Sequence, residues 1–295
     1  MTKLFFLGLS IASLCATAQN TITVTEVTKR MSIDTQPSFM VSIPQTTRKE
    51  VEKDWLKYLS AGSKGKTTVN NGENIQTGVV HKNISPKPFI VYSTVIETTD
   101  GVNLTGWFTE NDKTFFSKNL NADQALAVQK YVRDFAVIEY QDAVKEELKM
   151  EQNKLIALNK QLDNNINATE KSGKRIDNNN RAIEKGTDKI ATNNADIQSS
   201  SNKIVDQKAM VEQTSSDANA NKGAKQTLRE DERAKEKLQN HNENESKNIA
   251  AANKSTRAEE RNTATLKENE LSKEAQIEVQ KQKVQAVQIK LSNIK

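Results

Sequence analysis

A stripe of side chains spaced seven residues apart runs through the second half of this chain. Its members are Leu148, Leu155, Leu162, Thr169, Ile176, Ile183, Ile190, Ile197, Ile204 and Val211, and all but Thr169 are apolar. Because an α-helix has about 3.6 residues per turn, a strict repeat of seven keeps these side chains on one face and winds paired helices left-handed. The stripe predicts a long helix that pairs with another helix.

The second core position of the same heptad is mostly polar. After Leu158 it is occupied by Asn165, Ser172, Asn179, Gly186, Asn193, Ser200 and Gln207. Polar layers lower the stability of a coiled coil, and they also specify its register and its number of partners. We therefore expect a weak coiled coil with a defined partner.

Residues that favour turns interrupt the helical pattern at 214–223, which predicts the tip of a hairpin. The first arm would be a helix over 121–213, capped by Asn121, and the second a return helix over 224–295. The return helix carries its own apolar stripe of Ile277, Val284, Val287, Leu291 and Ile294. Folding near residue 218 brings this stripe opposite the leucines at the start of the first arm, so a monomeric antiparallel hairpin is favoured.

A parallel homo-oligomer is the open alternative. The spacing of Ile176, Ile183 and Ile190, with polar layers between them, resembles the stalks of trimeric autotransporters. That resemblance implies a stalk in which the partner helices come from other copies of the chain.

The part of the chain from 19 to 120 has a different composition. Beyond residue 18, every aromatic residue lies between Phe39 and Tyr140, and all prolines lie between Pro37 and Pro88. Aromatic side chains bury large areas, so this part can build a globular core, whereas the polar remainder of the chain cannot. A small head followed by a helical arm is the expected organisation.

Local patterns in the head predict an α+β fold, with an antiparallel sheet and one packed helix. Apolar residues alternate with polar ones around Phe39 and Ile43, which is typical of a strand. Thr47 and Glu50 form a capping box before an amphipathic helix. Asn71-Gly72 and Asp100-Gly101 are hairpin turns that separate four more strands. The expected head core includes Trp55, Leu59, Phe89 and Trp107.

Residues 1–18 have the pattern of a signal peptide. Lys3 precedes a short apolar run up to Cys15, and Ala16-Thr17-Ala18 suits cleavage before Gln19. We expect export to the periplasm or cell envelope and at most a peripheral membrane contact, since no later stretch is apolar enough to span a bilayer. Cleavage would remove Cys15, which is the one cysteine of the chain.

Motifs for chemistry are scarce. Gly65-Lys66-Thr67 resembles the end of a phosphate-binding loop but lacks the first glycine and a following helix. His81 and His241 are far apart in the sequence and have no evident metal-binding partners. The expectation is no catalytic, cofactor or metal site, and no enzyme. The charge balance is mild, with 43 Lys and Arg against 38 Asp and Glu, and the interspersed signs argue against nucleic acid as a partner.

In its overall organisation the chain resembles a group of uncharacterised exported proteins of Bacteroidetes. The shared features are the Ala18-Gln19 cleavage style, the short head, the charged segment from Tyr140 to Leu148, the Asn- and Lys-rich heptads, and the ending around Gln280 to Val287. The resemblance implies export, a small α+β head and a coiled-coil arm, and it implies no particular activity.

Two functions fit these expectations. In the first, the protein is a structural or interaction protein of the envelope, whose head docks on an unknown envelope protein and whose arm is a spacer or a protein-binding surface. In the second, it is a holdase-type periplasmic chaperone that grips unfolded chains, which would require apolar side chains near the arm tip. The mostly polar tip favours the first.

Overall fold

The computed structural model describes residues 21–295, so the expected signal peptide lies outside the described residues. The chain divides into two compact units. Among the described residues, one comprises 21–155 together with Gln280–Lys295, and the other comprises Ile156–Val279. We refer to them as the head unit and the distal arm.

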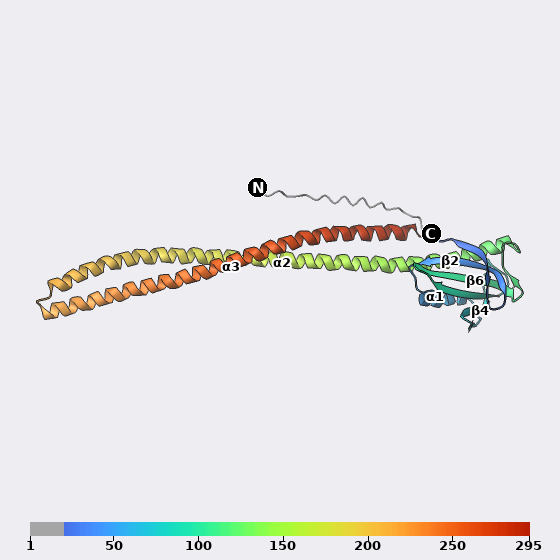
Figure 1. The fold of residues 1–295 in the computed structure, drawn as a ribbon, viewed down its shortest axis with the longest axis horizontal. Helices are drawn as coiled ribbons and strands as arrows, with labels where there is room; N and C mark the ends of the chain where they lie inside the picture. Colours follow the sequence, from blue (N-terminus) through green and yellow to red (C-terminus); the bar gives the residue numbers. More distant parts are fainter. Residues whose placement is uncertain (1–20) are drawn as a thin grey trace. The chain divides into compact units, whose positions relative to one another are not determined.

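The head unit contains a seven-stranded antiparallel sheet (Figure 1). Its strands are β1 (Val24–Arg30), β2 (Thr35–Pro44), β3 (Thr67–Asn70), β4 (Glu73–Val79), β5 (Phe89–Glu97), β6 (Gly101–Asn111) and β7 (Thr114–Phe115). The strand order is β1-β2-β6-β5-β4-β3, and β7 pairs with β6. The expected antiparallel sheet is confirmed, and the two-residue strand β7 is an element that the sequence patterns do not predict.

Both predicted hairpin turns are present. Asn71 and Gly72 have φ angles of 49° and 81°, the left-handed conformation that favours Asn-Gly in a two-residue turn. Gly101 lies where two strands approach closely, because a Cβ added there would come within 2.2 Å of the carbonyl oxygen of Ile43. Only glycine fits this position at the start of β6.

Helix α1 (Arg48–Ser60) begins at the predicted capping box. The Thr47 hydroxyl accepts a hydrogen bond from the Glu50 backbone, and the Glu50 carboxylate accepts one from the Thr47 backbone. Val51, Trp55 and Leu59 recur at helical spacing and are buried. They pack against residues of the sheet and of the long helix that follows it, α2 (Ala122–Gln213), in one continuous apolar core.

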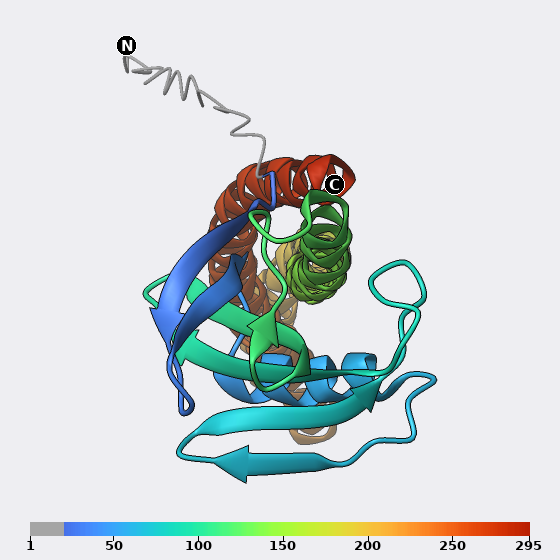
Figure 2. The same ribbon diagram turned by 90° about the vertical axis from the view of Figure 1, so that its right-hand side faces the viewer.

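Figure 2 shows the strands of the sheet in a second view. The two faces of this sheet carry different apolar clusters. Successive side chains of a strand point to opposite faces, so the larger cluster takes Val102, Leu104 and Phe108 of β6, and the smaller one takes Trp107. Of the expected core residues, Trp55, Leu59 and Phe89 lie in the larger cluster. Trp107 packs with Met31, Tyr92 and Phe115 on the opposite face.

Helix α2 (Ala122–Gln213) begins on the sheet. The Asn121 side chain accepts a hydrogen bond from the backbone of Gln124 at 3.1 Å, as an N-cap does. The first turns bury Ala125, Val128, Val132 and Phe135 in the larger cluster. The head core therefore fixes the start of the longest helix in the described chain.

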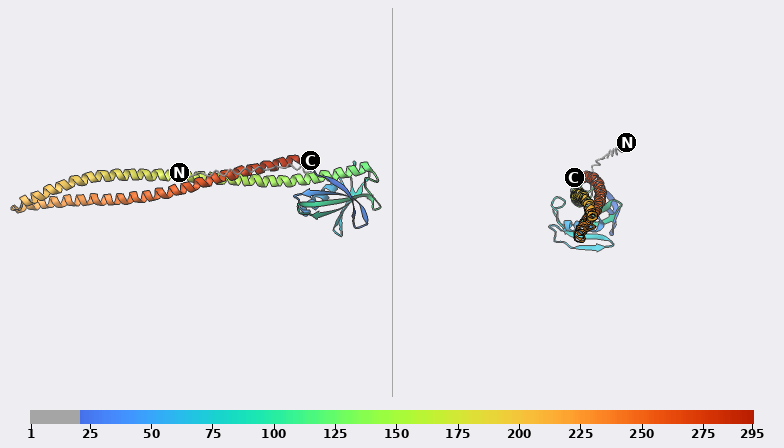
Figure 3. Two further views of the ribbon diagram at one scale, coloured as in Figure 1. Left: turned by 45° about the horizontal axis from the view of Figure 1, so that its top comes forward. Right: turned by 90° about the vertical axis from the view of Figure 1, so that its left-hand side faces the viewer.

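In the distal arm, α2 and α3 (Ala218–Asn293) run antiparallel side by side (Figures 1 and 3). Asn193 hydrogen-bonds to Asn242, and Lys189 pairs with Glu245. The numbers of paired residues sum to nearly the same value, which is the register of a hairpin turning near residue 217. The predicted coiled-coil hairpin is confirmed.

The tip is shorter than expected. The turn-favouring residues at 214–223 predict a non-helical segment, but α3 begins at Ala218. The Asp217 carboxylate accepts hydrogen bonds from the backbones of Asn219 and Ala220 at 3.0 and 3.2 Å. This side chain caps the new helix, so the polar residues after it continue as helix instead of extending the loop.

The expected core stripe faces the helix–helix contact. Ile204, Ile277, Val287 and Ile294 are buried, and the other members are half-buried: Leu148, Leu155, Leu158, Leu162, Ile176, Ile183, Ile190, Ile197, Val211, Val284 and Leu291. The polar second core positions also face the helix–helix contact, since Ser172 and Gly186 are buried. Between residues 21 and 295, no helix is both long and apolar enough to cross a membrane.

Candidate functional site

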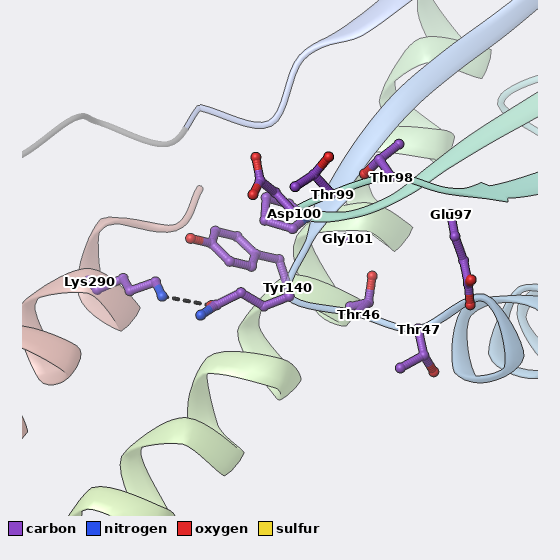
Figure 4. A pocket seen from close by; sticks show the side chains of 11 residues that line it. Thr46, Thr47, Glu97, Thr98, Thr99, Asp100, Gly101, Tyr140 and Lys290 are labelled. Atoms are coloured by element: carbon purple, nitrogen blue, oxygen red, sulfur yellow. Dashed lines mark hydrogen bonds between the residues drawn. The ribbon is translucent and has the colours of Figure 1, made fainter.

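A pocket of the head unit lies where two loops of the sheet meet both long helices. It has a volume of about 640 Å³. Its lining residues come from the end of β2 and the loop before α1, from the β5–β6 turn, from α2 and from α3: Pro44, Gln45, Thr46, Thr47, Glu97, Thr98, Thr99, Asp100, Gly101, Tyr140 and Lys290. Figure 4 shows Lys290 and Tyr140 on one side of this pocket and Thr46, Thr47 and Glu97 on the other.

Backbone contacts hold the two loops together. Gln45 has a positive φ of 59° and donates its backbone N–H to the carbonyl of Asp100 at 2.7 Å. Thr98 donates to the carbonyl of Gly101 at 2.9 Å, which closes the β5–β6 turn. A non-glycine residue with positive φ is uncommon and is held by its surroundings. These hydrogen bonds are the surroundings that hold Gln45 in place.

Lys290 is the cation of the pocket. Its Nζ atom lies 2.8 Å from Oε2 of Glu147 and 2.6 Å from Oε1 of Gln45. Gln45 also donates to the same Glu147 oxygen at 3.1 Å. The Nζ atom is 5.8 Å from the centre of the Tyr140 ring, within range of a cation–π interaction. These contacts hold the Lys290 side chain in place, so it links α3, α2 and the β2–α1 loop.

The last turns of α3 are part of the head core. Val287 and Ile294 are buried in the same cluster as Trp55 and the sheet residues. Arg133 of α2 donates to the carbonyl oxygens of Ile22 at 3.1 Å and of Lys295 at 2.9 Å. The end of α3 is thereby attached both by apolar burial and by polar contacts.

The threonines and carboxylates at the outer edge of the pocket are accessible. Glu97, Thr98, Thr99 and Asp100 are exposed. Hydroxyls and carboxylates of this kind hydrogen-bond to polar groups of a binding partner. The arrangement can recognise a surface, and its described part brings together no nucleophile and base.

The other chemical candidates from the sequence stay apart. His81 packs edge-on against Tyr131, with ring centres 4.7 Å apart, and His241 lies on the distal arm beside Lys189 and Glu245. Lys66 precedes β3, and its backbone pairs with Thr77, so this segment has no helix N-terminus for a phosphate. Among residues 21–295, no group of three or more His, Cys, Asp or Glu is arranged to hold a metal ion.

Sequence patterns alone identify only part of this pocket. The Asp100-Gly101 turn and the Thr47 cap are visible as motifs. Gln45, Glu147 and Lys290 have no local signal, because their roles depend on contacts between residues that are far apart in the chain. No known protein-family model matches the chain, and no curated protein matches it either.

Proposed function

We propose that this chain is a non-enzymatic structural or interaction protein of the cell envelope. The head docks on a partner protein, and the coiled-coil arm is a spacer or a protein-binding surface. The observation that carries this proposal is the burial of Val287 and Ile294 in the head core. The first turns of α2 and the last turns of α3 are both buried in the head core, so the head holds the hairpin by two helices instead of one.

The composition of the arm supports a role in contact with water and with other proteins. Charged and amide side chains dominate its outward positions, and several form ion pairs along the helix such as Lys247 with Glu243. Such pairs contribute little to stability individually, typically up to about 1 kcal/mol. These charged and amide side chains hydrate the surface of the helix pair and offer many polar contacts to a partner.

The self-pairing of the hairpin supports a monomer. The Ser172 hydroxyl donates to the Glu259 carboxylate at 2.5 Å and accepts from Thr263 at 2.9 Å. A polar layer satisfied between α2 and α3 disfavours a parallel pairing of α2 with α2 of other copies, because Ser172 would then lose Glu259 and Thr263 as partners. Export through a signal peptide and residence in the periplasm or envelope are part of the same proposal.

The test uses the chain from Gln19 onward with a photo-crosslinking residue at one of two exposed positions. Thr99 reports on the head pocket, and Lys185 reports on the arm. Crosslinking in intact envelopes should give one saturable product from Thr99, and an untagged excess of the protein should compete it away.

Three outcomes would overturn the proposal. Crosslinking to many unrelated proteins, with suppression of aggregation of an unfolded client, would indicate a holdase. A trimeric mass in light scattering would indicate a parallel stalk. Lack of any saturable product from either position would remove the docking role.

A further inference from the structure

A second cavity lies between α1 and α2, away from the pocket described above. Its volume is about 580 Å³, and its lining includes Tyr58 and Ala61 of the α1 end and Phe135, Ile138 and Glu139 of α2. Asp54, Lys57, Ser60 and Asp142 complete the lining. Carboxylates therefore enter one cavity from two packed helices.

The charged groups around this cavity are predominantly negative. Those facing Glu139 are Glu50, Lys53, Asp54 and Lys57 from α1 and Asp142 from α2. Asp142 has its own cation in Lys145 at 2.6 Å, and Asp54 is 4.0 Å from Lys53. Within the described part of the chain, the Glu139 carboxyl makes no ion pair or side-chain hydrogen bond. It differs in this from Asp142 and Asp54 of the same cavity.

One wall of the cavity is apolar and aromatic. Phe135 and Tyr58 have ring centres 5.3 Å apart, and Phe135 packs on the buried Trp55 at 4.8 Å. Ionising a carboxyl beside such a wall is costly, because the faces of the aromatic rings offer no hydrogen bonds and exclude water. The half-buried position of Glu139 thus favours its neutral form.

Burial raises the pKa of Glu139 to about 7, and the charges of Asp54, Asp142 and Glu50 act in the same direction, while Lys53 opposes them. The ordinary value is 4.5. A carboxyl whose pKa is raised on folding favours the folded state when it is protonated. Its contribution is present below pH 4.5 and is lost as the pH rises through about 7.

We propose that the contact between α1 and α2 is a pH-responsive element in which protonated Glu139 lets the helices pack closely and ionised Glu139 repels the carboxylates of α1. This inference goes beyond the proposed function and does not depend on it. Acidification tightens α1 on α2, and alkaline conditions loosen it. The structural change is confined to α1 and the aromatic cluster beneath it.

Amide hydrogen exchange of α1 in the full chain tests the proposal. After correction for the intrinsic pH dependence of exchange, wild-type α1 should lose about tenfold in protection between about pH 5 and about pH 8. Glu139→Gln should keep the high protection at both pH values, because a neutral amide replaces the titrating carboxyl. Glu146→Gln is the matched control, since Glu146 lies on the exposed side of the same helix, close to Lys149, and it should behave as the wild type.

A direct titration measures the ionisation of the Glu139 carboxyl itself. Carbon-13 labelled glutamate in the wild-type chain should show one carboxyl that titrates near neutral pH and is missing from the spectrum of Glu139→Gln. Titration of every glutamate in the ordinary acidic range would overturn the proposal. Protection of α1 that does not change with pH, or that changes equally in Glu139→Gln, would overturn it as well.

Discussion

The Nζ atom of Lys290 lies 2.8 Å from Oε2 of Glu147, and both side chains are more than two thirds buried. This ion pair connects α3 to α2 beside the pocket of the head. A pair at this depth loses part of its Coulomb energy to desolvation, but removing one partner leaves the other charge without compensation. Glu147 would keep only the hydrogen bond from Gln45.

Replacing Lys290 with Met should therefore destabilise the head unit by about 1 to 2 kcal/mol. Urea denaturation monitored by tryptophan fluorescence measures this, because both tryptophans lie in the head. Lys254→Met is the control, since Lys254 is exposed on the same helix and should change stability by less than about 0.5 kcal/mol. Equal effects of the two substitutions would show that the ion pair contributes nothing to stability.

Replacing Gly186 with Ala should stabilise the arm less than the same change at Gly173. Alanine is favoured over glycine inside a helix by about 1 kcal/mol. At Gly173 an added Cβ meets nothing within 4 Å, whereas at Gly186 it lies 3.0 and 3.2 Å from side-chain carbons of Ile249. Ile249 must shift by a few tenths of an ångström, which consumes part of the gain.

Thermal unfolding followed by circular dichroism at the helix band compares the two glycine variants. Gly173→Ala should raise the midpoint, and Gly186→Ala should raise it less or leave it unchanged. A larger rise at Gly186 than at Gly173 would contradict the close packing of Ile249 on this position.

Replacing both Asn193 and Asn242 with Leu should stabilise the arm and reduce its specificity. These amides hydrogen-bond to each other at 2.9 Å in the helix contact. An apolar pair of similar size removes the desolvation cost of the amides and should add about 1 to 2 kcal/mol. The same change removes a polar layer that specifies the antiparallel register of α2 on α3 against a parallel pairing of α2 with α2 of another copy.

Two measurements are needed for this double variant. The thermal midpoint should rise, and sedimentation should detect a larger share of dimers than for the wild type at the same concentration. A lower midpoint would mean that the amide layer is a net source of stability. An unchanged monomer would mean that other layers suffice to define the partner.

Acidification should weaken the distal arm. The hydrogen bond from Ser172 is the main cause that holds the pKa of Glu259 below its ordinary value. Desolvation opposes it, and the hydrogen bond from Arg175 adds to the lowering. The bond from Lys189 does the same for Glu245. A carboxyl with a lowered pKa stabilises the folded state above its ordinary value of 4.5, and this contribution is lost as the pH falls below it.

The thermal midpoint of the helical signal should consequently fall between about pH 5 and about pH 3. Glu259→Gln should show a smaller fall, because one of the titrating groups is gone. Glu260→Gln is the control, as Glu260 is exposed beside it, and its fall should match the wild type. A fall of equal size in Glu259→Gln would exclude this carboxylate as a source of the acid sensitivity.

Several elements of the fold are visible in the sequence because their signals are local. The heptad stripe from Leu148 predicts the helix pair, since a periodic apolar face needs a partner whatever else surrounds it. Thr47 with Glu50 and the Asn71-Gly72 pair predict a helix start and a turn for a similar reason, as both depend on hydrogen bonds or backbone angles within four residues. The sequence predicts a longer tip than the structure has, because the polar residues after Asp217 suit a capped helix as well as a loop.

Tertiary structure alone decided the pocket and the cavity. Lys290 and Gln45 are 245 residues apart in the chain and become hydrogen-bond partners only because the return helix ends in the head core. Trp107 is a core residue both in the sequence prediction and in the structure, but the pleat of β6 places it on the face of the sheet opposite Trp55. No local pattern marks Glu139, because its burial depends on the packing of α1, which is far away in the sequence. By itself, then, the sequence determined the periodic and local features of this protein, and folding in three dimensions decided which distant charges meet.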